Sequence, residues 1–390
     1  MKRLGLYIHI PFCIEKCRYC DFLSFGGNDE SLHLAYIEAL IAEIENIKGC
    51  GYEADSIYIG GGTPSLLNSD SIIKMMDAVS KAFAVSDNAE ISIEANPKTV
   101  TTQKLSAYHS AGINRLSMGA QSTDDGLLKV LGRVHNSSDI TVNYEQARKA
   151  GFDNINIDLM FAIPGQTRKQ WMNSLSDIIN LGPEHISFYS LQLEEGTPFY
   201  RMFTEGTLEY IDDETDRNMY HDAIEKLNSS GYMHYEISNA AKPGYQCEHN
   251  LKYWSMDEYL GLGLGSHSYI NGQRFSNERN LYKYIETGNK LIKKEKISMK
   301  QISGLSPFVV WEHKNSRQDD ISEYIFTGLR KIEGIQLNDF TDRFGISVNE
   351  IYNNEILEHI ENGLLELSEE RLKFTLKGID LSNFVLVDFV

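Results

Sequence analysis

Short apolar segments alternate with longer amphipathic ones through the first half of the chain. Six segments are rich in β-branched and aromatic residues, as strands are. Between them lie segments whose apolar residues recur at the three-to-four-residue spacing of one helix face. The expected strands cover residues 4–10, 56–60, 90–96, 115–119, 154–160 and 185–191, and the expected helices cover 32–47, 71–83, 101–111, 137–150 and 168–181. This alternating order predicts a parallel sheet with right-handed crossovers.

The alternation continues for six units and fades near residue 200, which sets the size of the main domain. Six units are too few to close an eight-stranded (β/α)8 barrel. The sequence therefore predicts an α/β fold, a partial (β/α)6 TIM-like barrel over residues 1–230. Residues 231–300 are expected to extend its core.

The end of the chain has a different pattern, from which we expect a second domain. Residues 301–318 are predicted to form a linker. Residues 319–390 are predicted to form a winged-helix-like α+β domain, because a helix-turn-helix pattern precedes a β-hairpin pattern. Many winged helices bind DNA, but residues 321–378 hold six Lys and Arg against eleven Asp and Glu, leaving a net charge of −5. This balance disfavours nucleic acid as a partner.

Polar and glycine-rich positions gather at the carboxyl ends of the expected strands. In barrels of parallel strands, the loops at these ends build the active site. Six positions therefore predict one shared site. They are the cysteine segment after the first strand, the GGGTP segment (60–64), Glu94, Gln121, Asp158 and Gln192.

Composition and charge exclude several classes of protein. The chain of 390 residues is 42% hydrophobic and 24% charged, which is typical of a soluble globular protein. Its net charge of −18 repels nucleic acid and anionic membrane surfaces. The short N-terminal apolar stretch contains His9 and does not match a secretory signal, and no apolar run is long enough to cross a bilayer. We therefore expect a cytoplasmic protein with reduced thiols, peripheral to a membrane if it meets one.

Three cysteines at the spacing C-x3-C-x2-C carry the strongest chemical signal: Cys13, Cys17 and Cys20. Thiolates are soft ligands that suit zinc or iron–sulfur clusters. A structural zinc site needs four ligands, typically as two pairs, and the remaining Cys50 and Cys247 are solitary. A zinc loop completed by a nearby histidine is the alternative. A [4Fe–4S] cluster can instead take three protein thiolates and leave one iron free for another ligand, so the motif predicts such a cluster.

The cysteine motif, with the aromatic Tyr19 before its third cysteine, resembles that of the radical S-adenosylmethionine (SAM) superfamily. In that superfamily the amino and carboxylate groups of SAM chelate the free iron, and the reduced cluster splits SAM to give a 5′-deoxyadenosyl radical. The GGGTP segment resembles the superfamily's glycine-rich element beside the methionine part of SAM, where glycine lets a backbone approach closely. The resemblance implies a [4Fe–4S] cluster and SAM as cofactors.

Further segments resemble the oxygen-independent coproporphyrinogen III oxidase group, in order along nearly the whole chain: YIHIPFC, GGGTPS, IEANP, RLSMGAQS, LGRVH, DLMFAIPGQT and GLGLGSHSY. The resemblance implies that ten positions bind SAM. They are Tyr7, Tyr19, Gly61, Gly62, Thr63, Glu94, Gln121, Arg133, Asp158 and Gln192, the last of which is often alanine in the oxidases. The chemistry agrees, because a carboxylate can accept from the ribose hydroxyls or the ammonium of SAM and an arginine can pair with its carboxylate.

Two features separate this chain from the decarboxylating enzymes of the group. The cysteine motif of those enzymes resembles C-x3-C-x2-C-x-C, and an N-terminal extension precedes it. In this chain Phe22 replaces the extra cysteine, and twelve residues precede Cys13. The CDF sequence and the HNLKYW segment (249–254) instead resemble the HemW family of heme chaperones. This resemblance implies that His249 binds heme, with Cys247 as a second candidate ligand. The other interpretation of His249 is a hydrogen-bonded histidine in a packed aromatic loop.

Two functions follow from the resemblance. The first is a chaperone that binds heme or a related porphyrin and passes it to a membrane-bound respiratory acceptor, with the cluster and SAM retained. The alternative is a radical SAM oxidoreductase that converts coproporphyrinogen III to protoporphyrinogen IX by oxidative decarboxylation of two propionates. Phe22 and the short segment before the cysteines favour the chaperone. Neither pattern bears on the oligomeric state.

Overall fold

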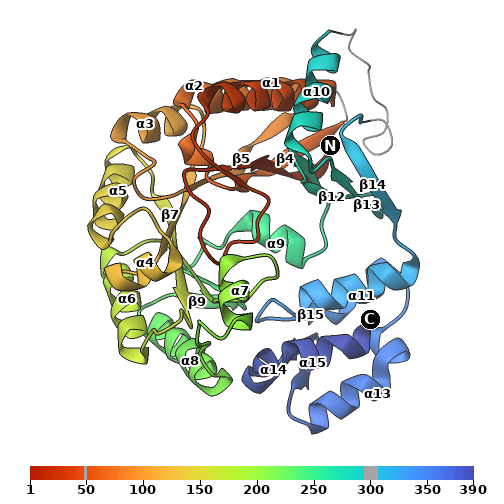
Figure 1. The fold of residues 1–390 in the computed structure, drawn as a ribbon. Helices are drawn as coiled ribbons and strands as arrows, with labels where there is room; N and C mark the ends of the chain where they lie inside the picture. Colours follow the sequence, from red (N-terminus) through yellow and green to blue (C-terminus); the bar gives the residue numbers. More distant parts are fainter. Residues whose placement is uncertain (48–50, 294–305) are drawn as a thin grey trace.

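The computed structural model describes residues 1–47, 51–293 and 306–390. Its main feature is a twelve-stranded sheet that curves into a ring with helices on its outer side (Figure 1). The strand order is β14-β13-β12-β11-β1-β4-β5-β6-β7-β8-β10-β9. Because this order begins at one strand and ends at another, the ring is an open, partial barrel.

Six of these strands, with the helices between them, form the expected βα units. They run parallel in the order in which they occur along the chain. The strands are β1 (Lys2–Ile10), β4 (Tyr52–Gly61), β5 (Ala84–Ala95), β6 (Arg115–Gln121), β7 (Asn154–Phe161) and β8 (His185–Ser190). The helices are α1 (Glu30–Asn46), α2 (Ser69–Ala82), α3 (Thr102–Ser110), α5 (Ser137–Lys149) and α6 (Arg168–Leu181), followed by α8 (Asp213–Ser229). The predicted α/β class and partial (β/α)6 barrel are confirmed.

The burial of these elements explains their sequence pattern. Every residue of β6 is buried, because helices cover one face of the parallel sheet and the ring encloses the other. Helix α6 begins with a capping box between Thr167 and Gln170 and ends at Gly182, which has the left-handed conformation that stops a helix. Local capping and apolar periodicity therefore agree with the global fold.

Further strands, most of them paired antiparallel, extend the parallel core at both ends. On one side lie β11 (Tyr259–Leu262), which pairs parallel with β1, then β12 (His267–Ile270), β13 (Gln273–Asn277) and β14 (Val309–Lys314). On the other side lie β10 (Asn239–Ala241) and β9 (Met233–Glu236). Strand β14 falls inside the range expected to be a linker, and residues 294–305, just before and at the start of that range, lie outside the described residues.

Among the helices that were not expected from the sequence are three short ones in the first 254 residues. Two of them, α4 (Asp125–Leu131) and α7 (Pro198–Thr204), follow β6 and β8. The third, α9 (Glu248–Trp254), replaces the loop expected after β9 and lies inside the ring of strands (Figure 1). It has seven residues, too few for a helical periodicity to stand out in the sequence.

The C-terminal part contains the helices and the hairpin expected there. It comprises α11 (Arg317–Gly328), β15 (Ile335–Gln336), α12 (Leu337–Phe344), α13 (Val348–Glu361), β16 (Leu365–Leu367) and β17 (Arg371–Phe374), followed by α14 (Leu376–Asp380) and α15 (Ser382–Leu386). Backbone hydrogen bonds join it to β9 and the turn that follows. Ile237 N–H donates to Arg330 O at 3.1 Å, and Ile332 N–H donates to Tyr235 O at 3.0 Å.

A buried carboxyl holds the glycine-rich segment after β11 against helix α1. Glu43 accepts hydrogen bonds from Gly263 N–H (2.7 Å), Asn277 Nδ2 (2.5 Å) and Tyr284 Oη (2.5 Å). Burial is the main cause that raises the pKa of Glu43 to about 7, although these donors partly oppose the shift. Folding therefore shifts this carboxyl towards its neutral form relative to the unfolded chain.

We expect this carboxyl to make the stability of the ligand-free protein fall with rising pH. The folded-state pKa of Glu43 lies above its unfolded value near 4.5, so its contribution is full below that value and is lost as pH rises through about 7. The measurement is the melting temperature between pH 5 and 8 for the wild type and for Glu43→Gln. The variant, which cannot ionise at this position, should show a flatter profile. An unchanged slope would contradict the assignment.

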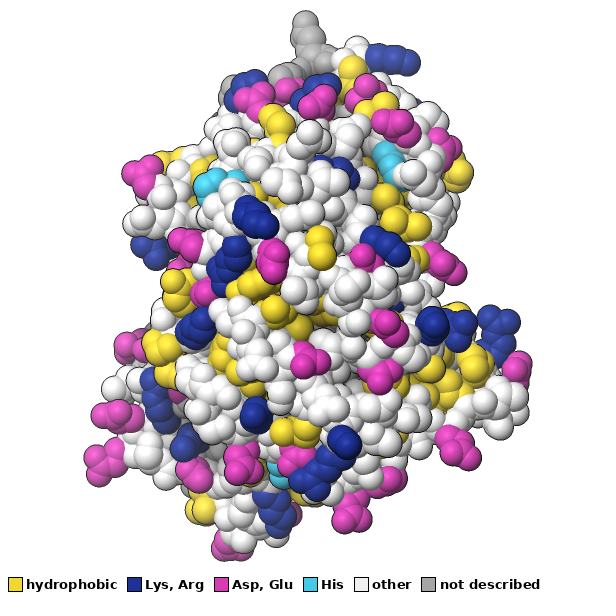
Figure 2. Space-filling model, turned by 90° about the vertical axis from the view of Figure 1, so that its left-hand side faces the viewer, with side chains coloured by type: hydrophobic (Ala, Val, Ile, Leu, Met, Phe, Trp, Pro, Cys, Tyr) yellow, Lys and Arg dark blue, Asp and Glu magenta, His cyan; other side chains and the backbone are white. Residues whose placement is uncertain are grey.

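The surface seen in Figure 2, over the outer helices on the left of Figure 1, carries charges of both signs side by side. Lys and Arg side chains are interspersed with Asp and Glu, and apolar side chains appear in small groups. This face therefore lacks the field of one sign that a polyanion requires. None of the helices in the described part of the chain is long and apolar enough to cross a membrane.

Candidate cofactor site

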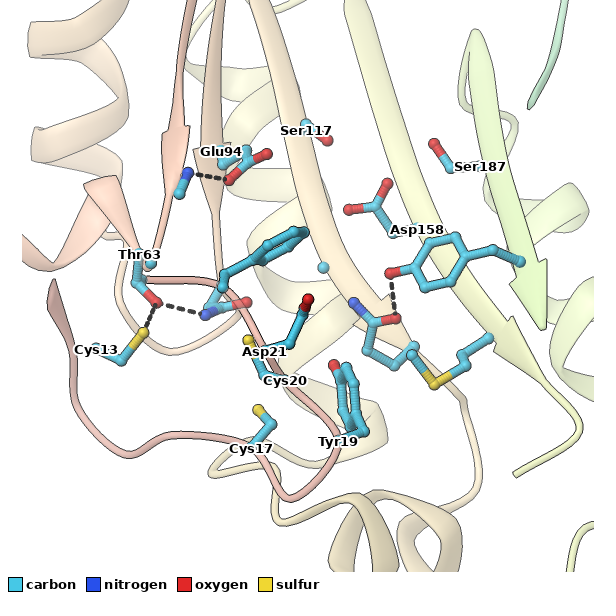
Figure 3. Close-up of a pocket in the computed structure, with 18 of the residues that line it drawn as sticks. Cys13, Cys17, Tyr19, Cys20, Asp21, Thr63, Glu94, Ser117, Asp158 and Ser187 are labelled. Atoms are coloured by element: carbon cyan, nitrogen blue, oxygen red, sulfur yellow. Dashed lines mark hydrogen bonds between the residues drawn. The ribbon is translucent and has the colours of Figure 1, made fainter. Parts of the chain in front are cut away.

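A cavity of about 470 Å³ opens at the carboxyl ends of the parallel strands. Cys13, Cys17 and Cys20 line it. Nine of the ten positions expected to bind SAM line it too: Tyr19, Gly61, Gly62, Thr63, Glu94, Gln121, Arg133, Asp158 and Gln192. Figure 3 shows the cysteine loop on one side and the side chains of Glu94, Ser117, Asp158 and Ser187 on the strands that face it. The strand ends thus form one site, although their residues come from distant parts of the chain.

The cysteine loop is short and closed on itself. Its two ends pair as the strands β2 (Phe12–Cys13) and β3 (Phe25–Gly26), and Gly27 N–H donates to Cys13 O at 3.0 Å. Burial raises the pKa of the Cys13 thiol, and it raises that of Cys20 to about 11. Both thiols are therefore protonated at neutral pH, and binding of a metal cluster must displace those protons.

A chain of hydrogen bonds connects the first two cysteines through three polar residues. Thr63 Oγ1 donates to Cys13 Sγ at 3.6 Å and accepts from Asn96 Nδ2 at 2.8 Å. Arg133 donates to Asn96 Oδ1 through one amino group and to Cys17 Sγ, at 3.5 Å, through the other. The sulfur atoms of Cys13 and Cys17 therefore each face a donor, as cluster-bound thiolates do.

The glycine segment packs directly on the backbone of the cysteine loop. Gly62 N–H donates to Ile10 O at 2.8 Å, and Thr63 N–H donates to Phe12 O at 2.7 Å. A Cβ atom on Gly62 would lie 2.7 Å from Phe12 O, closer than such atoms can approach. Gly61 has φ of 115°, which favours glycine, and its N–H donates to Glu94 at 3.0 Å. The glycines thus allow the loop and the sheet to meet.

Two partly buried carboxyl groups line the cavity. Glu94 accepts from Gly61 N–H and from Tyr58 Oη, both at 3.0 Å. Asp158 accepts from Asn156 Nδ2 at 2.7 Å. Burial, followed by repulsion from Asp158, raises the pKa of Glu94 to about 7, and burial also raises that of Asp158. A ligand that carries positive charge would stabilise the ionised form of both carboxyl groups and lower their pKa values. The pair is therefore suited to bind a cation.

Backbone strain occurs at the end of β6. Gln121 has φ of +66°, an unusual value for a residue other than glycine, and its side chain accepts from Tyr189 Oη at 2.9 Å. Such strain is found where a fold holds a side chain in a functional position. The strained conformation coincides with a position that the sequence placed in the site.

Tyr7 is the one expected SAM-binding position that does not line the cavity. Its hydroxyl shares a hydrogen bond with His9 Nδ1 at 2.9 Å, and its ring stacks on that of Tyr58. The other ring nitrogen of His9, Nε2, lies 2.8 Å from Leu23 O. Both nitrogens of His9 are thus occupied, which speaks against a zinc loop completed by this histidine.

The two candidate heme ligands also lie outside the cavity. His249 is 1% exposed, and its ring nitrogens lie 2.9 Å from Ser56 Oγ and 2.8 Å from Tyr253 Oη. Cys247 is equally buried, with Sγ 3.5 Å from Glu90 Oε1. In this conformation neither residue can reach a ligand in the cavity. Asn250, the residue after His249, does line the cavity.

Among the residues of the cavity wall that the sequence-based reasoning missed are Asn96, Tyr189 and Asn250. Asn96 links Thr63 to Arg133, and Tyr189 and Asn250 line the wall as well. Of these three, Asn96 had a signal in the sequence, because it follows Glu94 by two residues, the spacing at which strand side chains point to the same face. Tyr189 lies within an expected strand, and Asn250 belongs to the unexpected helix α9.

Comparison with protein families gives two matches along the chain. Residues 7–178 match the radical SAM superfamily, and residues 315–381 match the HemN C-terminal domain. The chain is 36% identical to a heme chaperone HemW of Bacillus subtilis over 387 residues, with 98% of each chain covered. It is 38% identical to a heme chaperone HemW of Escherichia coli over 269 residues, which cover 68% of this chain and 70% of the relative.

A solved structure shares the fold of the whole chain. The radical SAM enzyme coproporphyrinogen III oxidase (HemN) of Escherichia coli superposes with a TM-score of 0.83 at 21% identity. The match covers 100% of this chain and 90% of the oxidase. At this identity the likeness establishes the common architecture, a partial barrel with a C-terminal part.

Proposed function

Since the chain belongs to the HemW family within the radical SAM superfamily, we propose that it is a heme chaperone, which binds heme and delivers it to acceptor proteins. The observation that carries the proposal is the match to HemW relatives along nearly its full length. The proposed acceptors are membrane-bound respiratory proteins, which the chain would meet from the cytoplasm as a peripheral protein. Phe22, in place of the extra cysteine of the decarboxylating enzymes, supports this choice.

The proposed resident cofactors are a [4Fe–4S] cluster and SAM. Cys13, Cys17 and Cys20 would hold the cluster, since they line one cavity and two of the sulfur atoms already face donors. Three thiolates leave one iron for an external ligand, which fits SAM. When bound, the reduced cluster supplies an electron for the cleavage of SAM.

The cavity wall has the charges that SAM requires. Glu94 and Asp158 provide negative charge for its sulfonium or ammonium group, and Arg133 provides positive charge for its carboxylate. The Gly61–Thr63 segment offers backbone that a ligand can approach closely, and Gln121 and Gln192 offer carboxamides. Tyr19 supplies an aromatic face for the base. Tyr7 would act from behind Tyr58, through its contact with that ring.

We expect SAM to bind more tightly as pH rises through 7. Glu94 must ionise to face a cation, and burial beside Asp158 raises its pKa to about 7 in the ligand-free protein. Below that pH, binding must expel a proton and the affinity should fall by up to about tenfold per pH unit. The measurement is the dissociation constant of SAM from pH 6 to 8 with the reconstituted cluster. Glu94→Gln should bind weakly with little dependence on pH, and a wild-type profile in this variant would contradict the expectation.

One experiment tests the proposed function against the alternative enzyme. Purified, anaerobically reconstituted protein is titrated with ferric heme and, in parallel, incubated with coproporphyrinogen III, SAM and a reductant. The proposal expects saturable heme binding near one heme per chain and no protoporphyrinogen beyond background. Catalytic formation of protoporphyrinogen IX would overturn the chaperone in favour of the dehydrogenase. Transfer of bound heme to apo-acceptor in membrane vesicles completes the test.

A further inference from the structure

The HNLKYW segment is built into the fold as a closure of the barrel. It forms α9 inside the ring of strands, and its first turn is fixed by a side chain of β5 (Figure 1). The carboxylate of Glu90 accepts from the backbone N–H groups of Glu248 and His249, both at 3.2 Å. Arg115, buried on β6, lies 3.8 Å from the same carboxylate and compensates its charge. The barrel strands thus supply the groups that hold the start of the helix.

His249 is the central contact of this closure. A neutral imidazole has one donor and one acceptor nitrogen, and Ser56 and Tyr253 occupy both. The ring also stacks on Tyr58 with centroids 5.4 Å apart. A bond from His249 to a heme iron would therefore require the loss of these contacts and movement of the helix out of the barrel.

The other polar and aromatic residues of the segment have structural partners too. Lys252 Nζ lies 2.8 Å from Asp55 on β4, in a largely buried ion pair. The ring of Trp254 lies under the guanidinium of Arg330, 4.5 Å from its centroid, which ties the helix to the C-terminal part. Asn250 differs, because its carboxamide forms no hydrogen bond with any described residue and it lines the cavity.

From these contacts we infer that the HNLKYW helix closes the barrel at the level of Ser56 and Glu90 and presents Asn250 to the cavity. In this arrangement His249 is a positioning residue, not an iron ligand. This inference rests on the proposed function, because that function supplies the two ligands considered, SAM and heme. It replaces the interpretation of His249 and Cys247 as heme ligands with one in which they hold α9 in place.

Asn250 is one of several uncharged polar residues that line the cavity. Ser238 and Asn239, which join β9 to the start of β10, line the same cavity, and Asn239 Oδ1 is buried without a partner among the described residues. The carboxyl groups of Glu94 and Asp158 face the same space and repel anions. Ser238, Asn239 and Asn250 offer uncharged hydrogen-bonding groups, which suit the hydroxyls or the base of a nucleoside.

The test distinguishes whether His249 binds the heme iron or holds α9 in place. Ser56→Ala/Tyr253→Phe removes both partners of His249 but keeps the imidazole, whereas His249→Ala removes the ring. We expect both to lower the melting temperature by about 5 °C or more and to weaken SAM binding alike, with the absorption spectrum of bound ferric heme unchanged in position. An imidazole-ligated heme spectrum that disappears in His249→Ala and persists in the double variant would overturn the inference.

Asn250→Ala provides the second arm, in the full-length, cluster-reconstituted protein. We expect an unchanged melting temperature and iron content, and SAM binding weaker by about tenfold, the effect of one hydrogen bond to a neutral partner. SAM affinity equal to that of the wild type would remove Asn250 from the site. The melting temperatures can be measured without heme. If the protein bound no heme, the proposed chaperone function would be refuted, and the role of α9 in closing the barrel could still be tested. A melting temperature unaffected by His249→Ala would refute the closure.

Discussion

Replacement of Cys13, Cys17 or Cys20 by serine is expected to abolish cluster binding. Each thiolate would bind one iron, and we expect that two thiolates alone cannot retain the cluster. The iron content should therefore fall from about four per chain to near zero. The loss should be the same for all three single variants, because all three side chains line one cavity. Iron analysis and the visible absorption of anaerobically reconstituted protein measure it.

Cys247→Ser is the matched control for these variants. Cys247 is buried against Glu90, outside the cavity, and serine can still donate to that carboxylate. The control should keep the full iron content with a modest change in stability. If a single-serine variant among the three motif cysteines retained four irons, the assignment of that cysteine would be wrong. If Cys247→Ser lost iron, the three-thiolate site itself would be wrong.

Gly62→Ala is expected to damage both the fold and the site. The added methyl group would lie 2.7 Å from Phe12 O and 2.9 Å from Phe12 N, both backbone atoms that cannot turn aside. The cysteine loop must then shift away from the sheet, at a cost of about 1–3 kcal/mol. The hydrogen bonds of Gly62 N–H to Ile10 and of Thr63 N–H to Phe12 would weaken with it. We therefore expect a lower melting temperature and poor retention of iron.

Gly26→Ala tests whether the effect is specific to that contact. Gly26 lies in the same loop, but an added Cβ would meet its nearest neighbour, Lys16 N, at 3.8 Å, which is ordinary contact. This variant should keep the melting temperature and the iron content of the wild type. Equal tolerance of alanine at both glycines would show that the loop does not depend on the close approach at Gly62.

The barrel could be predicted because its signals are local. A strand or an amphipathic helix shows its period within ten or so residues, and the ends of parallel strands meet at one edge whatever the loops between them. Glu94, Gln121 and Asp158 were placed together for this reason, and the structure brings them to one cavity. The winged-helix elements followed from the same local patterns.

The surroundings of His249 could not be predicted in this way. Its partner Ser56 lies 193 residues earlier in the chain, and the cap of its helix comes from Glu90. Nothing in the seven residues of α9 indicates that they fold inside the barrel. The expected reason for the glycine segment was likewise incomplete, because Gly62 makes room for the backbone of Phe12 as well as for a ligand.

The position of β1 has a consequence for the order in which the chain is built. This strand lies between β4 and β11, so its second neighbour is Tyr259–Leu262, some 250 residues further along. A growing chain therefore exposes one edge of its first strand, and the start of the cysteine loop, until that segment has left the ribosome. Pairing at such a sequence distance is slow. We expect the nascent protein to need protection of this edge, and the finished sheet to form only late in synthesis.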